Sequence, residues 1–195
     1  MSDAPVCATL PVRLDRLPAP PRYDAWPVAV RHAMKLRGAL VPCGPGFRGA
    51  GWPETPAVRL NALAEWLGSR CFACRLTAAW VWGAARHPGR PLTHAVRAGH
   101  RVSAPASPGV TYPQLRLRSG DVVRIGRFET TSPLRTALDL LRSADAFGAV
   151  EIVACRLLLP LIPGGAESLR SEVLQRRQPG RRIARERLPI IGLRP

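Results

Sequence analysis

The clearest local signals of the fold lie in DVVRIGRFETTSPLRTALDLL, residues 121–141. Val122–Ile125 and Phe128–Thr131 contain β-branched, partly alternating residues, and the glycine between them predicts a turn that joins two strands. Ser132-Pro133 then predicts a helix start, because serine caps the free N–H groups of a first turn and proline suits the first helical position. The following residues place one apolar stripe on the helix, at Leu134, Ala137, Leu138 and Leu141. We therefore expect a β-hairpin that leads directly into a helix over 133–142.

The sequence on both sides of this stretch predicts an α+β fold. Thr55-Pro56 repeats the helix start, and the periodicity after it predicts a helix over 56–67, followed by a shorter helix over 76–82. Further β-like stretches, separated by proline and glycine, lie within 91–131. A helix over 145–159 is apolar on nearly every face, which predicts a central place in the core, and another helix is expected over 166–187. Residues 55–188 thus form a mixed helix/antiparallel-β domain with a helical C-terminal part, and 189–195 form a tail.

The first 54 residues predict a smaller unit. Residues 1–23 are a proline-rich lead-in with little periodicity. Asp24 is the predicted N-cap of a helix over 24–37, and 39–43 is a short apolar strand. Glycine and proline make 44–52 a loop, which we expect to exclude strand pairing. Helix, strand and basic loop in this order make 24–54 a reduced winged-helix-like unit, in which the preceding helices are missing or reduced.

Positive charge dominates the composition. The 195 residues include 29 Lys+Arg against 13 Asp+Glu, a formal net charge of +16, and no carboxylate occurs between Glu65 and Asp121. Lys35 is the only lysine, so codon bias toward arginine is an alternative source of part of this pattern, although it would not remove carboxylates. The charge favours a phosphate-rich partner such as nucleic acid. The candidate phosphate contacts are Arg31, Lys35, Arg37, Arg48, Arg176, Arg177, Arg181 and Arg182.

Several classes of protein are disfavoured. No apolar run reaches the roughly 18 residues of a membrane span, and no secretion signal is visible. Five irregularly spaced cysteines are typical of reduced thiols, so we expect a cytoplasmic protein. The pair Cys71 and Cys74 lacks the second pair that a zinc site needs. Neither a catalytic triad, a phosphate-binding loop nor a carboxylate cluster for Mg²⁺ is present, so we expect no enzymatic activity, metal or cofactor.

Two segments carry a family resemblance. LTAAWVWG, residues 76–83, resembles the T-A-A-W-x-x-G helix of AbiEi-type antitoxins and their actinobacterial relatives. Residues 121–141 resemble the second hallmark of that family, a strand pair that leads into T-S-P-x-R-T-A-L-D-L. The residues that match the two motifs are Thr77, Ala78, Ala79, Trp80, Gly83, Ser132, Pro133, Arg135, Thr136 and Asp139. The resemblance covers roughly residues 36–187 and places the wing of a winged helix at 38–41 and 46–49.

The resemblance implies a DNA-binding transcriptional regulator or antitoxin, without the nuclease domain that some relatives append. Its DNA target would be its own promoter region. Two alternatives remain open: a protein-interaction module that binds a cognate toxin, and an inactive remnant of a longer nuclease-bearing relative. The motif residues also have a structural interpretation. Arg135 and Asp139, at i and i+4, are placed to pair with each other, and Trp80 and Trp82 are suited to packing.

Overall fold

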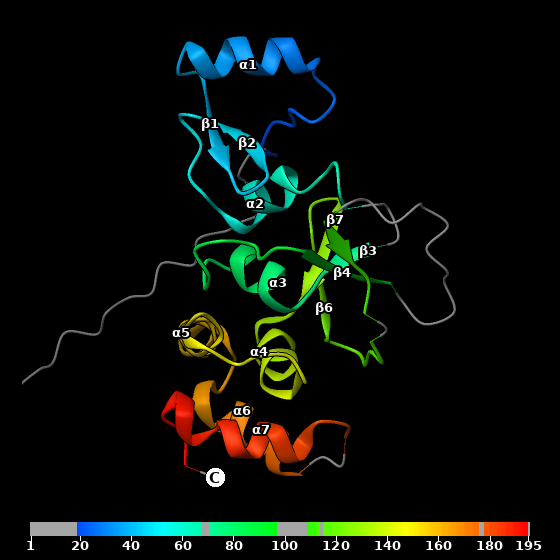
Figure 1. Cartoon of the computed structure of the whole chain (residues 1–195), viewed down its shortest axis with the longest axis vertical. Helices are drawn as coiled ribbons and strands as arrows, with labels where there is room; N and C mark the ends of the chain where they lie inside the picture. The colour runs from blue at the N-terminus through cyan, green and yellow to red at the C-terminus, as the bar shows by residue number, and fades with distance from the viewer. Residues whose placement is uncertain (1–18, 68–70, 97–108, 114, 176–177, 195) are drawn as a thin grey trace, which may run out of the picture.

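The computed structural model describes residues 19–67, 71–96, 109–113, 115–175 and 178–194. Figure 1 shows the described elements arranged along one long axis, with α1 at one end, the central sheet beside α3, and α4 to α7 toward the other end. The helices are α1 (Val28–Leu36), α2 (Pro56–Ala62), α3 (Arg75–Val81), α4 (Pro133–Arg142), α5 (Ala149–Leu158), α6 (Gly165–Gln175) and α7 (Arg181–Arg187), with 3-10 turns η2 (Leu159–Leu161) and η3 (Pro189–Ile191). The strands are β1 (Leu40–Cys43), β2 (Gly46–Gly49), β3 (Cys71–Ala73), β4 (Leu92–Val96), β5 (Val110–Thr111), β6 (Val122–Ile125) and β7 (Phe128–Thr131). The α+β class predicted from the sequence is thus observed.

The larger sheet is mixed, which corrects the antiparallel sheet expected from the sequence. Its strand order is β5-β4-β3-β7-β6. The pairs β3–β4 and β6–β7 are antiparallel, whereas β3–β7 and β4–β5 are parallel. Within this sheet, the strand that was not predicted from the sequence is β3, whose three residues are too few to show a period. Because β3 lies between β4 and β7, this short strand joins the two halves of the sheet.

Residues 121–141 have the structure expected from their sequence. Strands β6 and β7 pair from Val122↔Thr131 to Ile125↔Phe128, and α4 begins at Pro133. The Ser132 hydroxyl accepts a hydrogen bond from the Arg135 backbone N–H at 3.4 Å, as a helix N-cap does. Thr55 caps α2 in the same way, accepting from the Val58 N–H at 3.3 Å. Both Ser/Thr-Pro helix starts predicted from the sequence are therefore present.

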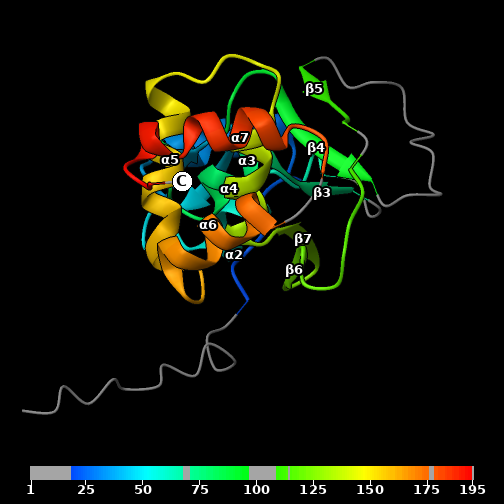
Figure 2. The ribbon, with the colours of Figure 1, turned by 90° about the horizontal axis from the view of Figure 1, so that it is seen from below.

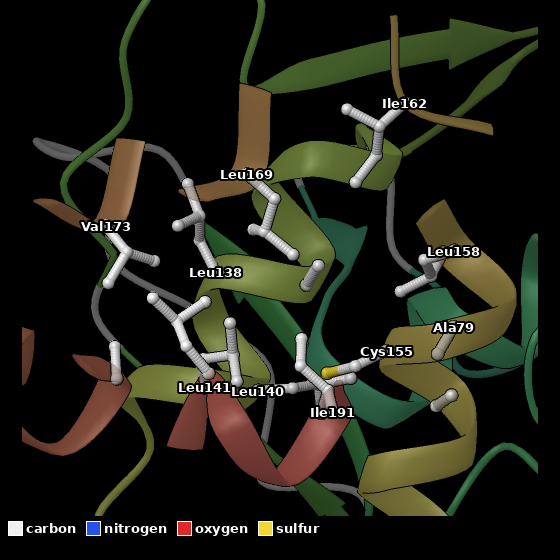
Figure 3. Close-up of a cluster of buried hydrophobic side chains, with 14 of the residues drawn as sticks. Ala79, Leu138, Leu140, Leu141, Cys155, Leu158, Ile162, Leu169, Val173 and Ile191 are labelled. Atoms are coloured by element: carbon white, nitrogen blue, oxygen red, sulfur yellow. The ribbon is translucent and has the colours of Figure 1, made fainter. Parts of the chain in front are cut away.

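Helix α4 is central to the main apolar core (Figure 3). Its buried residues Leu138, Leu140 and Leu141 pack with side chains of α3, α5, α6 and η3, which include Ala79, Cys155, Leu158, Leu169, Val173 and Ile191. Each buried leucine contributes roughly 1.5–3 kcal/mol of transfer free energy, so this cluster is a major source of stability. Seen from below, α7 covers the end of this helical layer (Figure 2).

The C-terminal part differs from the prediction in three respects. Helix α5 begins at Ala149 rather than 145 and is not buried all round, since Val150, Val153 and Leu157 are each at least half exposed. The single helix expected over 166–187 is two helices, because Gly180 takes a φ of +74° at the start of α7 and interrupts the chain. The expected tail contributes to the core, where Ile191 is 3% exposed.

The N-terminal unit is a helix followed by a two-stranded hairpin. Helix α1 begins at Val28 with Pro27 as its N-cap, and Asp24 instead forms an ion pair with Arg22. The expected loop at 44–52 contains β2, which pairs with β1 from Leu40↔Gly49 to Cys43↔Gly46. This correction has a local cause, because Gly44 supplies the positive φ (+56°) that a two-residue hairpin turn requires. Helix α2, expected to reach residue 67, ends at Ala62 and continues as turns.

Candidate nucleic-acid interface

Helix α1 presents a basic end that nothing in the described chain neutralises. None of its nine residues is buried, and the helix lies at one end of the molecule (Figure 1). Lys35, in the last turn, and Arg37, the C-cap residue, are both exposed. Within residues 19–67 and the other described ranges, neither side chain forms a hydrogen bond or an ion pair. These two predicted contact residues are therefore available to phosphate.

The other two predicted head residues are held within the protein. Arg31 Nη1 lies 2.6 Å from Glu65 Oε1, and its side chain is only 14% exposed. Arg48 Nη1 donates to the Trp52 carbonyl oxygen at 2.7 Å, and its Nε lies 3.4 Å from the Glu54 carboxylate. Phosphate contact by either arginine requires the exchange of an intramolecular partner. The pair of Arg31 with Glu65 was not predicted, since Glu65 lies 34 positions away in the sequence.

The hairpin turn rests against the body of the protein rather than projecting as a free wing tip. A Cβ atom at Gly44 would lie 2.6 Å from the Trp80 ring of α3, and one at Gly46 would lie 2.3 Å from the Ala62 carbonyl oxygen. Figure 1 shows the hairpin between α1 and α2. Insertion of this turn into a DNA groove is therefore disfavoured, and α1 is the exposed basic element of the N-terminal unit.

The predicted C-terminal arginines lie far from α1. Arg176 and Arg177 are outside the described residues. Arg181 donates to the Leu174 carbonyl oxygen, and Arg182 forms an exposed i,i+4 pair with Glu186 at 2.8 Å. Because α7 and α1 occupy opposite ends of the long axis (Figure 1), the two predicted basic clusters do not form one surface.

The residues of the first family motif stabilise α3 and its surroundings. Thr77, Ala78 and Ala79 are fully buried, and Trp80 is 2% exposed. The Thr77 hydroxyl donates to the Pro88 carbonyl oxygen at 2.7 Å and accepts from the Thr93 N–H at 2.8 Å. Gly83 has a φ of +82° just after the helix, a conformation that favours glycine. Trp80 thus packs in the core, as its structural interpretation predicted.

The second motif builds a buried ion-pair network around Arg135. Its Nε donates to Asp139 Oδ1 at 2.8 Å, and its Nη1 donates to Asp121 Oδ2 at 2.6 Å and to the Arg116 carbonyl oxygen at 2.8 Å. The pairing of Arg135 with Asp139 expected from their spacing is therefore observed. Asp139 is 8% exposed, and burial raises the pKa of its carboxyl group to about 6, outweighing the attraction of Arg135. Thr136, which follows Arg135 in the sequence, is fully buried and shares a 2.7 Å hydrogen bond with Thr131.

Residues 66–120, which include no Asp or Glu, contribute scattered positive charges to the surface. Arg75 reaches outside this interval to pair with Asp145 at 2.8 Å. Arg86, Arg90, Arg116 and Arg118 have exposed side chains, whereas Arg70, Arg97 and Arg101 lie outside the described residues. The interval therefore spreads its charge over several loops of the described chain.

No metal-binding or reactive-thiol chemistry is evident in the described residues. They contain no group of three or more His, Cys, Asp or Glu side chains placed to hold a metal ion. Cys43, Cys71, Cys74 and Cys155 are free thiols. Burial raises the pKa of Cys43 to about 11 and that of Cys155 to about 12, which disfavours the nucleophilic thiolate. In the same described ranges, no single helix is long and apolar enough to cross a membrane, and the pair 149–161 and 165–175 reaches that length only across a 114° bend.

Comparison of the chain with protein-family models, curated proteins and solved structures finds no match. The function of the chain is therefore inferred from its geometry and charge.

Proposed function

We propose that the protein is a non-enzymatic DNA-binding regulator of the AbiEi-like type, with α1 as its principal DNA contact. The observation that carries this proposal is the exposure of α1. An isolated helix of nine residues is marginal in water, and none of the residues of α1 is fully buried, so the helix gains little stability from packing. Its exposed basic end, with Lys35 and Arg37 unpaired in the described chain, suits a polyanion that adds the missing contacts.

The charges at this end set the expected salt dependence. Lys35 and Arg37 supply two phosphate contacts without any rearrangement. Arg31 and Arg48 supply two more if phosphate replaces Glu65 and Glu54 as their ion-pair partners. Each contact contributes about −0.9 to the slope of log K against log salt concentration. Two to four contacts therefore predict a slope of about −2 to −4. Such contacts position the protein on DNA, and base reading would need side chains of α1 in the major groove.

The test is a fluorescence-anisotropy titration of the full chain with the DNA fragment upstream of its own gene. Scrambled DNA of the same length is the competitor, and the titration is repeated at two salt concentrations. We expect at least tenfold preference for the upstream fragment, which corresponds to about 1.4 kcal/mol. Equal affinity for both DNAs, or a salt slope near zero, would contradict the proposal.

A matched pair of double variants locates the contact. Lys35→Gln with Arg37→Gln removes two charges from α1, whereas Arg182→Gln with Arg185→Gln removes two from α7. We expect the first double variant to lower the magnitude of the salt slope by about 2 and the second to leave it unchanged. Equal effects of the two would mean that binding depends on net charge alone, and α1 would not be the contact.

One observation favours the second candidate function, binding of a protein partner such as a cognate toxin. Val150, Val153, Leu157 and Leu161 recur at i, i+3, i+7 and i+11 along α5 and η2, and each is 44–55% exposed. A contiguous apolar stripe of this kind marks interaction surfaces in soluble proteins. This candidate predicts a complex with the product of an adjacent reading frame that survives high salt and is lost in Leu157→Asp. Loss of the complex at high salt, or its survival in Leu157→Asp, would contradict it.

A further inference from the structure

A cleft of about 920 Å³ lies on the described surface away from α1. It is bordered by the β1–β2 turn, by Trp66 in the segment that follows α2, and by the loop that connects α3 to β4. Its lining residues are Gly44, Pro45, Trp66, His87, Pro88, Gly89, Arg90, Pro91, Leu92 and Gly109. The volume falls within the range of small-molecule sites in proteins.

Hydrogen bonds fix the walls of this cleft. The Thr77 hydroxyl holds the Pro88 carbonyl oxygen at 2.7 Å, and the Leu92 N–H donates to the Gly109 carbonyl oxygen at 2.7 Å. Gly89 has a φ of +85°, and a Cβ at that position would approach Leu76 Cδ2 to 3.2 Å. Among the other lining residues, the Trp66 carbonyl oxygen lies 3.0 Å from the buried His94 Nδ1, and the Gly44 turn rests on Trp80. A cleft built in this way is preformed, which lowers the entropic cost of binding a ligand.

The chemistry of the lining selects one class of ligand. Trp66 is half-buried and, with three prolines and Leu92, provides aromatic and apolar surface. His87 and Arg90 are exposed, and neither side chain forms a hydrogen bond or ion pair within the described part of the chain. No carboxylate is among the described lining residues. A cationic ligand would find no counter-charge here, whereas a ligand with a planar ring and an anionic group finds a partner for each part.

We propose that this cleft binds a nucleotide, with the base against Trp66 and the phosphate at Arg90. Base stacking on tryptophan and a charge-assisted bond from arginine to phosphate are the interactions that hold single nucleotides in other proteins. His87 adds a second hydrogen bond to the phosphate. The nucleotide is either free or one unit of a single strand. The cleft shares no residue with the α1 contact proposed for duplex DNA, so either proposal can fail without the other.

The test uses the full chain and two probes, adenosine monophosphate by isothermal titration calorimetry and a fluorescent eight-nucleotide single strand by anisotropy. Arg90→Gln removes the proposed phosphate contact. Arg86→Gln is the matched control, because Arg86 is an exposed arginine of the same loop that does not line the cleft. We expect Arg90→Gln to weaken binding at least tenfold and Arg86→Gln to weaken it less than twofold.

The outcomes separate the sources of the ligand. Binding of both probes with this selective loss supports a nucleotide site open to free and strand-borne units, and binding of one probe alone with the same loss assigns the site to that source. Trp66→Phe should retain most of the binding and Trp66→Leu should lose it, with thermal unfolding curves to show that both variants fold. Absence of binding to both probes, or equal losses in Arg90→Gln and Arg86→Gln, would overturn the proposal. Duplex binding to the upstream fragment should be unchanged in Arg90→Gln, which separates this site from α1.

Discussion

The buried network around Arg135 makes a quantitative prediction about stability. In Arg135→Met the side chain keeps much of its volume but loses the guanidinium group that bonds Asp139 and Asp121. Asp139 is 8% exposed, so the change leaves a buried carboxylate without its bonded cation. Removal of one partner from a buried pair costs about 3–5 kcal/mol. That is a large part of the roughly 5–15 kcal/mol that stabilises a domain of this size, so we expect a marked loss of stability at pH 7.

The size of the loss alone does not separate charge from packing, and a double-mutant cycle does. Asp139→Leu removes the carboxylate and leaves Arg135 bonded to Asp121. In the double variant Arg135→Met with Asp139→Leu no uncompensated charge remains at Asp139, and well-packed apolar pairs often replace buried ion pairs at little cost. We therefore expect the double variant to be more stable than Arg135→Met alone, with a coupling energy on the order of 2 kcal/mol.

Urea unfolding followed by tryptophan fluorescence measures each free energy, provided that the m-values agree among the four proteins. Arg182→Met is the control, since its exposed pair with Glu186 should change stability by no more than about 0.5 kcal/mol. A double variant whose loss of stability equals the sum of the two single losses would show that the two side chains are not coupled. Arg135 would then stabilise the fold by packing alone.

Three further predictions follow from particular residues. Burial raises the pKa of Asp139 from 3.8 to about 6, so the folded state loses stability as pH rises from about 4 to 6. Wild type should lose about 2 kcal/mol relative to Asp139→Asn over this range, as measured by urea unfolding, and a constant difference would contradict this. Gly44→Ala should lower the free energy of unfolding by about 2–4 kcal/mol, because of its positive φ and its clash with Trp80. Gly38→Ala, with a similar φ and open space around it, should lower it by about 1 kcal/mol. Equal thermal shifts of the two variants would mean that the turn does not rest on Trp80. Among the described cysteines, the half-buried Cys71 should react first with a thiol reagent in the native protein, before the buried Cys43, Cys74 and Cys155, and simultaneous reaction of all four would contradict the burial observed here.

Local signals in the sequence predicted the elements whose chemistry is local. The helix over 133–142 was predicted with its observed bounds because Ser132, Pro133 and an apolar period all lie within ten residues. The two strands before it were also predicted from local signals, since β-branched residues lie on both sides of a glycine turn. Strand β3 has only three residues, and its place between β4 and β7 depends on partners remote in sequence, so no local pattern indicated it. Strand β2 was missed because glycine weakens a strand, yet the positive φ of Gly44 closes a hairpin there.

The candidate sites were less predictable, since charge in a sequence does not show which charges are neutralised. Arg31 and Lys35 lie on the same helix, but only Lys35 is free in the described chain, because Glu65 comes from a segment after α2. The cleft beside Arg90 was not predicted from the sequence. Trp66, His87 and Arg90 lie in two separate segments, and the proline and glycine residues around Arg90 indicated only a loop.

The positions of the motif residues bear on what the family resemblance can explain. Thr77, Trp80 and Thr136 are buried, Ser132 caps a helix, and Arg135 holds a buried network. These residues stabilise the packing of α3 and α4, so the residues that carry the resemblance belong to the scaffold of the protein. Function depends on sites placed on a scaffold rather than on the scaffold itself. The three surfaces proposed to bind partners lie outside both motifs. They are the basic end of α1, the apolar stripe of α5 and the cleft beside Arg90. Substitutions in the motifs should therefore change stability, and substitutions on these three surfaces should change binding while leaving the unfolding curve in place.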